Sequence, residues 1–213
     1  MKPIPQYMDC VEAAKSSASG SHVLPPPPRN PPPKSKMGSL ELIIGCMFSG
    51  KSSLLIRRIH ELADAGLNIL AINHASDKRY SQKSLIHTHN HVSYPCYSAT
   101  SISDAVNAAN LALYDHVCID EAHFFADLSE QVVKITDHYN KCVIVAGLSG
   151  TYARAPFPQI MNLIPHADII HHLKGTCSVC GNPAIFSKRL TSESETMVVG
   201  GSEKYTCVCR NCI

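Results

Sequence analysis

Three groups of residues in the sequence could do chemistry, and the first is Gly45-Cys46-Met47-Phe48-Ser49-Gly50-Lys51-Ser52. This segment follows the P-loop pattern, in which two glycines precede a lysine and a hydroxyl residue at fixed spacing. The glycines allow a tight turn, so that successive backbone N–H groups converge on phosphate oxygens. Lys51 would neutralise the outer phosphates, and the Ser52 hydroxyl would ligate the bound magnesium ion. The pattern predicts that a nucleoside triphosphate binds at residues 45–52.

A second candidate group is Asp120-Glu121, which directly follows the apolar run at residues 116–119. Two acids at the end of an apolar strand resemble a Walker B element. Asp120 would hold the magnesium ion, and Glu121 could act as a general base that takes a proton from an attacking hydroxyl or water. Together with the P-loop, the pair predicts phosphoryl transfer or hydrolysis, without separating a kinase from an ATPase.

The third group is a pair of Cys-x-x-Cys motifs near the end of the sequence, formed by Cys177, Cys180, Cys209 and Cys212. Four thiolates can surround a zinc ion tetrahedrally in a closed, structural site. The start of the chain lacks the apolar core of a signal peptide, so we expect a reduced, intracellular setting that disfavours two disulfides. The motifs therefore predict structural zinc.

The stretch between the two motifs contains Gly200-Gly201, which favours a bend between two extended arms. With zinc at its base, this stretch would form a tethered lid. On this interpretation, loss of Cys177 would release zinc and loosen the lid, but would leave ATP binding at the P-loop largely intact.

Other candidate side chains lie near these groups. Asp77 and Arg79 fall in a polar loop, where an arginine could offset charge on a transferring phosphoryl group or could equally be solvated. Phe124 and Tyr152 could sandwich a planar base, although each could equally pack in the core.

The elements that must position these groups alternate along the chain. Strands are predicted at residues 42–44, 68–73, 116–119 and 142–146, and helices at 52–65, 103–112 and 128–139. Such alternation predicts an α/β fold, a P-loop NTPase-like parallel sheet flanked by helices. The P-loop would then lie at the carboxyl edge of the sheet, where such folds bind ligands.

Length and composition limit the alternatives. The chain has 213 residues, a net charge of +2 and no run of apolar residues long enough to span a membrane, so neither nucleic acid nor membrane is an expected partner. The Pro-rich residues 1–36 predict a disordered tail, with recognition by a proline-binding domain as the alternative. We expect a nucleotide-binding domain at 37–173 and a zinc-binding lasso domain at 174–213, in a cytoplasmic protein.

Taken in order, these features resemble the zinc-containing, cytosolic thymidine kinase family over residues 38–212. The matching segments are GCMFSGKSS, DKRYS, THN, IDEAHFF, GLSGTYARAPF, CSVC, VVGGSEKY and CRNC. The resemblance implies transfer of the γ-phosphate of ATP to the 5′-hydroxyl of thymidine, and acceptance of deoxyuridine is an open alternative. It also implies a homotetramer that is inhibited by thymidine triphosphate.

The resemblance assigns roles residue by residue, with Glu121 as the catalytic base. The implied ATP-binding residues are Gly45, Cys46, Met47, Phe48, Ser49, Gly50, Lys51, Ser52, Asp77, Lys78, Arg79, Asp120, Glu121, Ala122 and His123. The implied thymidine-binding residues are Met47, Phe124, Tyr152, Thr196, Met197, Val198, Val199, Gly200 and Tyr205. Ser52 and Asp120 would hold magnesium, and the four cysteines zinc.

The sequence departs from the family pattern near the expected base. His123 stands in place of a glutamine, Ser149 of an aspartate and Tyr152 of a phenylalanine, which affects efficiency and substrate range. Asp-Glu-Ala-His at 120–123 also spells the DEAH signature, so the alternative is a zinc-containing, nucleic-acid-dependent ATPase of helicase or repair type.

Overall fold

The computed structural model describes residues 37–77, 85–87, 92–106, 111–192 and 198–213, so the predicted tail at 1–36 lies outside the described residues. A six-stranded sheet with the order β5-β2-β6-β7-β1-β8 forms the centre. All of its pairings are parallel, which confirms the predicted α/β class. Its strands are β1 (Ser39–Gly45), β2 (Ile69–His74), β5 (Tyr97–Ala99), β6 (His116–Ile119), β7 (Cys142–Leu148) and β8 (Ile169–Leu173).

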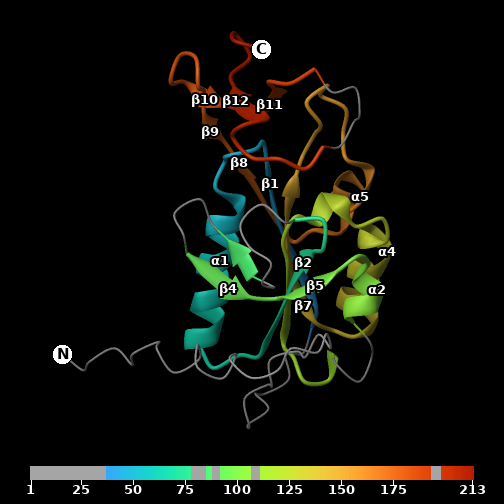
Figure 1. The fold of residues 1–213 in the computed structure, drawn as a ribbon. Helices are drawn as coiled ribbons and strands as arrows, with labels where there is room; N and C mark the ends of the chain where they lie inside the picture. The colour runs from blue at the N-terminus through green and yellow to red at the C-terminus, as the bar shows by residue number, and fades with distance from the viewer. Residues whose placement is uncertain (1–36, 78–84, 88–91, 107–110, 193–197) are drawn as a thin grey trace, which may run out of the picture.

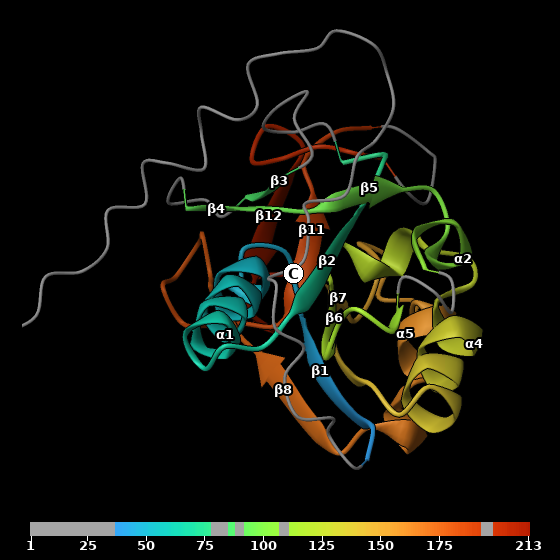
Figure 2. The same ribbon diagram turned by 90° about the horizontal axis from the view of Figure 1, so that it is seen from below.

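Helices cover both faces of this sheet (Figures 1 and 2). Helix α1 (Lys51–Asp64) lies on one face, and α2 (Ile102–Ala105), α4 (Leu128–Val133) and α5 (Pro158–Met161) lie on the other. Successive side chains of β1 point to opposite faces of the sheet. Ile43 lies in the apolar cluster that contains Leu55 of α1, and Leu42 lies in the cluster that contains Leu128 of α4.

Two helix predictions differ from the structure. The predicted helix at 103–112 is wrong as a continuous element, because α2 ends at Ala105 and Val106 adopts extended angles, φ −130° and ψ 123°. The predicted helix at 128–139 has the right extent, but its last turn is the π-helix η3 (Lys134–His138). There the Thr136 hydroxyl lies 3.1 Å from the Val132 carbonyl oxygen and so competes for the main-chain acceptors.

Short elements complete the described chain. The turns η2 (Ala122–Phe124) and η4 (Ile164–His166) flank the sheet, and β3 (Leu85–His87) pairs with β4 (Ser93–Pro95). Residues 174–213, here called the C-terminal unit, contain β9 (Gly175–Thr176) paired with β10 (Pro183–Ala184) and β11 (Phe186–Arg189) paired with β12 (Tyr205–Val208). The C-terminal unit sits beyond the carboxyl ends of β1 and β8 (Figure 1).

Candidate active site

The P-loop connects β1 to α1 at the carboxyl edge of the sheet, as predicted. A side chain at Gly45 would lie 2.5 Å from the Leu173 carbonyl oxygen and 2.7 Å from Ser49 Oγ, so only glycine fits. Gly50, the N-cap of α1, has φ 84° and so occupies the left-handed region that glycine tolerates. The two glycines of the pattern thus have different reasons: Gly45 allows the close approach of the Leu173 main chain, and Gly50 adopts left-handed backbone angles.

The hydroxyl and ammonium groups of the loop turn inward. Ser49 Oγ and Lys51 Nζ each donate a hydrogen bond of 2.8 Å to the carbonyl oxygen of Cys46. Lys51 is therefore folded over the loop, where a phosphate oxygen could replace this carbonyl as its acceptor. Ser52 is half-buried in the first turn of α1, next to the loop.

Asp120 and Glu121 reach the same edge on β6, with β7 lying between β6 and β1. Val145 of β7 pairs with both Leu42 and Ile119, so the two acids and the P-loop leave the sheet on one side. Asp120 is only 3% exposed. Glu121 has φ 48° and ψ 35°, a left-handed conformation that costs a residue other than glycine about 1–3 kcal/mol.

His123 packs beneath the Glu121 carboxylate. Its Nδ1 accepts a long hydrogen bond of 3.4 Å from the Leu148 N–H, which turns Nε2 toward Glu121. That Nε2 lies 3.7 Å from Glu121 Oε2. The ring is wedged between Phe124 and Phe157, with centroid distances of 4.2 and 4.8 Å, so these aromatic rings fix its orientation.

The remaining predicted ATP contacts lie in two places. Ala122 is fully buried, main chain included, so the structure does not expose it to a nucleotide. Asp77 follows β2, and its Oδ2 accepts a hydrogen bond of 3.2 Å from Asn73 Nδ2. Lys78 and Arg79 lie outside the described residues.

Three rings, those of His74, Phe124 and Phe125, pack together after the ends of β2 and β6. His74 stacks on Phe124 with a centroid distance of 5.4 Å and meets Phe125 edge-on at 4.7 Å. Burial lowers the pKa of His74 below the usual 6.5, so this ring is neutral at pH 7. Phe124 thus stands between two histidine rings at the predicted base pocket.

The described part of the predicted lasso is anchored by Tyr205. The Tyr205 hydroxyl donates a hydrogen bond of 2.8 Å to the Val198 carbonyl oxygen, and the Tyr205 N–H donates one of 3.0 Å to the Gly201 carbonyl oxygen. A Cβ atom on Gly200 would lie 2.6 Å from Cδ of Lys204, so a larger residue at this position would require the Lys204 side chain to move. Val199 is 39% exposed, and Thr196 and Met197 lie outside the described residues.

Cys177, Cys180, Cys209 and Cys212 converge as predicted, with all four sulfur atoms within 4.8 Å of one another. A tetrahedral zinc site with Zn–S bonds of about 2.3 Å needs S–S distances of about 3.8 Å. The Cys180 and Cys209 sulfurs are 3.5 Å apart, so the thiol set fits a metal ion of this kind. No described cysteine is in a disulfide, so all four thiols of the cluster are available as ligands.

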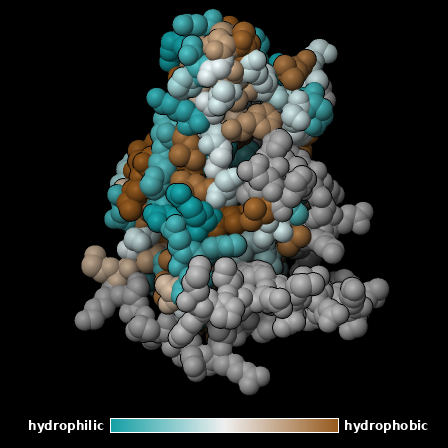
Figure 3. Space-filling view, turned by 90° about the vertical axis from the view of Figure 1, so that its left-hand side faces the viewer, coloured by the Kyte–Doolittle hydropathy of each residue, from teal (hydrophilic) through white to brown (hydrophobic). Residues whose placement is uncertain are grey.

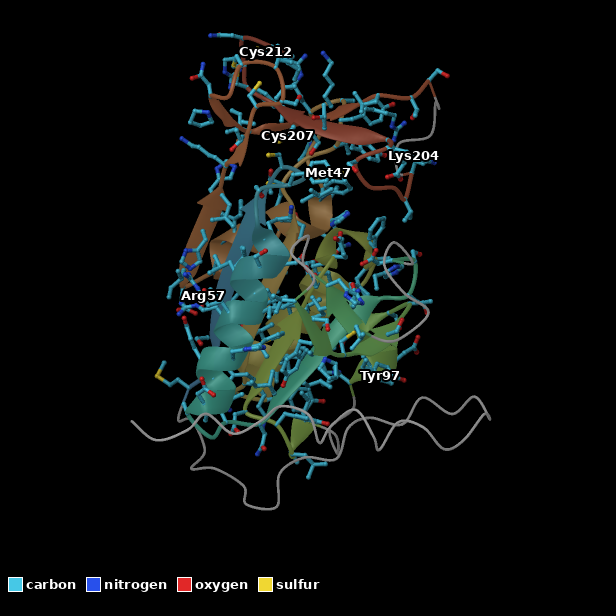
Figure 4. All side chains as sticks on the ribbon, turned by 60° about the vertical axis from the view of Figure 1, so that its left-hand side comes forward. Met47, Arg57, Tyr97, Lys204, Cys207 and Cys212 are labelled. Atoms are coloured by element: carbon cyan, nitrogen blue, oxygen red, sulfur yellow. The ribbon has the colours of Figure 1, made fainter. Side chains whose placement is uncertain are left out.

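The C-terminal unit also packs directly on the P-loop. The Met47 N–H donates a hydrogen bond of 3.0 Å to Ser187 Oγ, and the Cys46 thiol lies 3.5 Å from the Ala184 carbonyl oxygen. Cys46 shares an apolar cluster with Cys177 and other residues of the unit. Figure 4 shows Met47 lying next to Cys207 at this junction. The phosphate loop and the cysteine cluster therefore support each other.

Sequence reasoning missed two residues of this region. Ser187 contacts the P-loop, and Arg189 lies against Tyr152 and Tyr205. Both are on β11, whose pairing with β12 has no short-range signal because the strands are connected through a long segment. The available signal was the presence of Ser187 and Arg189 in the short segment that follows the first Cys-x-x-Cys motif.

Comparisons with known proteins agree with this geometry. Residues 38–213 match the family model described as thymidine kinase. The chain is similar to thymidine kinase a of Arabidopsis thaliana, with 38% identity over 176 residues, covering 81% of this chain and 74% of the relative. It is 38% identical over 175 residues to the thymidine kinase of Monkeypox virus, with coverage of 82% and 96%. The Yaba monkey tumor virus (strain VR587) thymidine kinase is 39% identical over 178 residues, with coverage of 84% and 96%.

Proposed function

Because the chain belongs to the thymidine kinase family, we propose that it transfers the γ-phosphate of ATP to the 5′-hydroxyl of thymidine at the carboxyl edge of the sheet. The observation that carries this proposal is the meeting of three features at that edge. The P-loop and the Asp120-Glu121 pair lie at the same edge of the sheet, and the C-terminal unit, which contains the segment anchored by Tyr205, packs on the P-loop. The P-loop would bind the triphosphate of ATP, and the segment anchored by Tyr205 would enclose the thymidine that accepts the phosphate.

The proposed roles follow from charge and position. Lys51 would exchange the Cys46 carbonyl oxygen for phosphate oxygens as ATP binds. Glu121, whose side chain is 13% exposed, would accept the proton of the 5′-hydroxyl as that oxygen attacks the γ-phosphorus, while the bond from the γ-phosphorus to the bridging oxygen breaks and ADP leaves. The backbone N–H groups of residues 46–52 would cradle the phosphates, and Asp77 with Lys78, Arg79, Ala122 and His123 would complete the ATP site.

The nucleoside would lie between the P-loop and the C-terminal unit. We propose that Met47, Phe124 and Tyr152 enclose the base, and that Thr196 to Gly200 close over it through main-chain groups. Tyr205 supports this because it already holds the Val198 carbonyl oxygen in place.

Two metal ions fit the residues present. The four-thiol cluster suits structural zinc, because it offers four ligands and leaves no position open for substrate. The Ser52 hydroxyl and the buried Asp120 carboxylate are oxygen ligands of the kind that magnesium prefers. Magnesium, when bound with ATP, would neutralise charge that develops on the phosphates.

Assembly and location extend the proposal. We propose a homotetramer that binds thymidine triphosphate as an end-product inhibitor in the cytoplasm. Ile169 and Ile170 of the edge strand β8 are 48% and 43% exposed, as expected of residues that meet another subunit. On the face that carries α1, hydrophobic patches also reach the surface between hydrophilic ones (Figure 3). No helix among the described residues is long and apolar enough to cross a membrane.

A nucleoside panel tests the function. The protein, labelled ATP and magnesium would be incubated with thymidine, deoxyuridine, deoxycytidine or deoxyadenosine, and the products separated by chromatography. We expect thymidine 5′-monophosphate, with deoxyuridine a poorer substrate, because a missing methyl group costs about 1–3 kcal/mol of discrimination. Phosphorylation of none of these nucleosides would contradict the proposal.

The same assay addresses the DEAH-type alternative, to which the family match lends no support. ATP hydrolysis that DNA or RNA stimulates, and that thymidine leaves unchanged, would favour that alternative. We expect no such stimulation.

A further inference from the structure

Arg189 connects the two parts of the molecule that would face the nucleoside base. It lies on β11 of the C-terminal unit, directly opposite Tyr205 of β12 in the antiparallel register. Its guanidinium carbon is 3.8 Å from the centroid of the Tyr152 ring, which follows β7 of the central sheet. Arg189 therefore bridges the central sheet region and the C-terminal unit.

The contact with Tyr152 fixes one face of that ring. At 3.8 Å from the ring centroid, the guanidinium carbon lies over the ring, and the cation is attracted by its π-system. With the guanidinium over one face of the ring, a planar base would stack on the opposite face. Stacking on one face would hold the ring at the angle that the base requires.

The contact with Tyr205 extends to the main chain of the lasso. Arg189 Nη2 donates a hydrogen bond of 2.8 Å to the Tyr205 hydroxyl, which donates one of 2.8 Å to the Val198 carbonyl oxygen. Arginine is always a donor, so the phenol oxygen must accept from it and can turn its own proton only toward another acceptor. Arg189 thereby sets the direction of the hydrogen bond that holds Val198.

We propose that Arg189 is a positioning residue for the nucleoside, because one side chain orients both the Tyr152 ring and the Val198 carbonyl group. The inference rests on the proposed function, since it assumes that a base enters between these two groups. Arg189 acts through Tyr152 and Tyr205 and does not itself take part in phosphoryl transfer.

Kinetics of Arg189→Met and Arg189→Lys test the proposal, with Lys188→Met as the matched control. Lys188 is the exposed neighbour on the same strand. Arg189→Met should raise KM for thymidine about tenfold, the joint loss expected for a ring-stacked cation and a charged hydrogen bond, and should leave KM for ATP within about twofold. Arg189→Lys should restore part of the affinity, because lysine keeps the charge and one donor but loses the planar stack. Lys188→Met should behave as wild type.

Hydrogen exchange gives a second readout that needs no turnover. Arg189→Met, with the zinc content of wild type, should exchange the amides of residues 198–205 faster than Lys188→Met does. Equal thymidine KM values for Arg189→Met and wild type would overturn the proposal while leaving the kinase function intact. If the wild type phosphorylates no nucleoside, the proposed function fails instead. If the amides of residues 198–205 also exchange equally fast in Arg189→Met and Lys188→Met, Arg189 does not anchor this segment.

Discussion

Glu121 combines a strained backbone with the position of the proposed base. Its left-handed φ of 48° directs the carboxylate away from the line of β6 and places it beside His123. The Glu121 side chain is only 13% exposed and its carboxylate lies 3.7 Å from His123, so the strained backbone holds a charged group in a largely enclosed position. A residue held in such a conformation at a sheet edge is typical of a functional site.

Glu121→Gly should therefore separate stability from function. Relief of the backbone strain should make this variant at least as stable as Glu121→Gln, by up to about 1 kcal/mol once the greater freedom of unfolded glycine is included. Thermal unfolding of both variants checks this. A lower melting temperature for Glu121→Gly than for Glu121→Gln would contradict the assignment of strain.

His74 should make stability depend on pH. Burial lowers the pKa of His74 in the folded state, so the unfolded chain binds a proton more readily below its pKa of about 6.5. The full stability is present above pH 6.5 and is lost as the pH falls toward the lowered value. Urea unfolding at pH 7.5 and 5.5 should show a smaller loss for His74→Gln than for wild type.

The exposed His138 provides the control for this measurement. His138→Gln is measured at the same two pH values, so that the effect of replacing a histidine in general is separated from that of replacing His74. If His74→Gln and wild type lose the same unfolding free energy between the two pH values, the neutral state of His74 in the fold is disproved.

Among the elements, the contact between the P-loop and the C-terminal unit changes an expectation. The interpretation of the zinc-bound stretch as a tethered lid predicted that ATP binding at the P-loop would stay largely intact after loss of Cys177. The structure instead ties Met47 to Ser187 and places Cys46 in one cluster with Cys177. The phosphate loop thus depends on the unit that zinc would hold together.

Removal of zinc should therefore weaken ATP binding as well as thymidine turnover. We expect Cys177→Ser to weaken ATP about fivefold, the effect of one lost hydrogen bond to the loop backbone. Calorimetric titration with ATP and magnesium measures it. The control is Cys142→Ser, a half-buried thiol of β7 outside the cysteine cluster. Wild-type ATP affinity in a zinc-free Cys177→Ser protein would show that the loop is independent.

The elements also show what sequence patterns could reveal. The prediction at 116–119 matches β6 residue for residue, because an apolar run is bounded by acids, and the P-loop pattern located the start of α1 within one residue. β8 was missed, because Ile169-Ile170-His171-His172-Leu173 mixes apolar and polar residues without period two. The helix at 103–112 was overextended, because side-chain spacing does not reveal the extended backbone at Val106.

For the whole molecule, the site was predictable where chemistry requires a short motif, and not where distant segments meet. The cysteine cluster and the two acids could be recognised from spacing alone. The role of Arg189 could not be recognised in this way, because it depends on contacts with Tyr152 and Tyr205 that form only when β11 pairs with β12. The domain boundaries at 36/37 and 173/174 stay predictions.

Removal of residues 1–36 should leave the enzyme intact. This segment is rich in proline and lacks apolar periodicity, so we expect it to contribute nothing to the core. Deletion of 1–36 should keep the melting temperature and the thymidine turnover of the full chain. Deletion of 1–44 is the control, because it removes the buried Leu40 and Leu42 of β1 and should prevent folding. A loss of turnover on deletion of 1–36 would assign the segment a role.

The central claim is that Glu121 takes the proton of the thymidine 5′-hydroxyl, and single-turnover phosphorylation by Glu121→Gln tests it most directly. Glutamine keeps the size of the side chain but cannot act as a base. The wild type should form thymidine 5′-monophosphate, and the variant should do so at least about 100-fold more slowly at saturating ATP. A variant that forms the product at the wild-type rate would contradict the account.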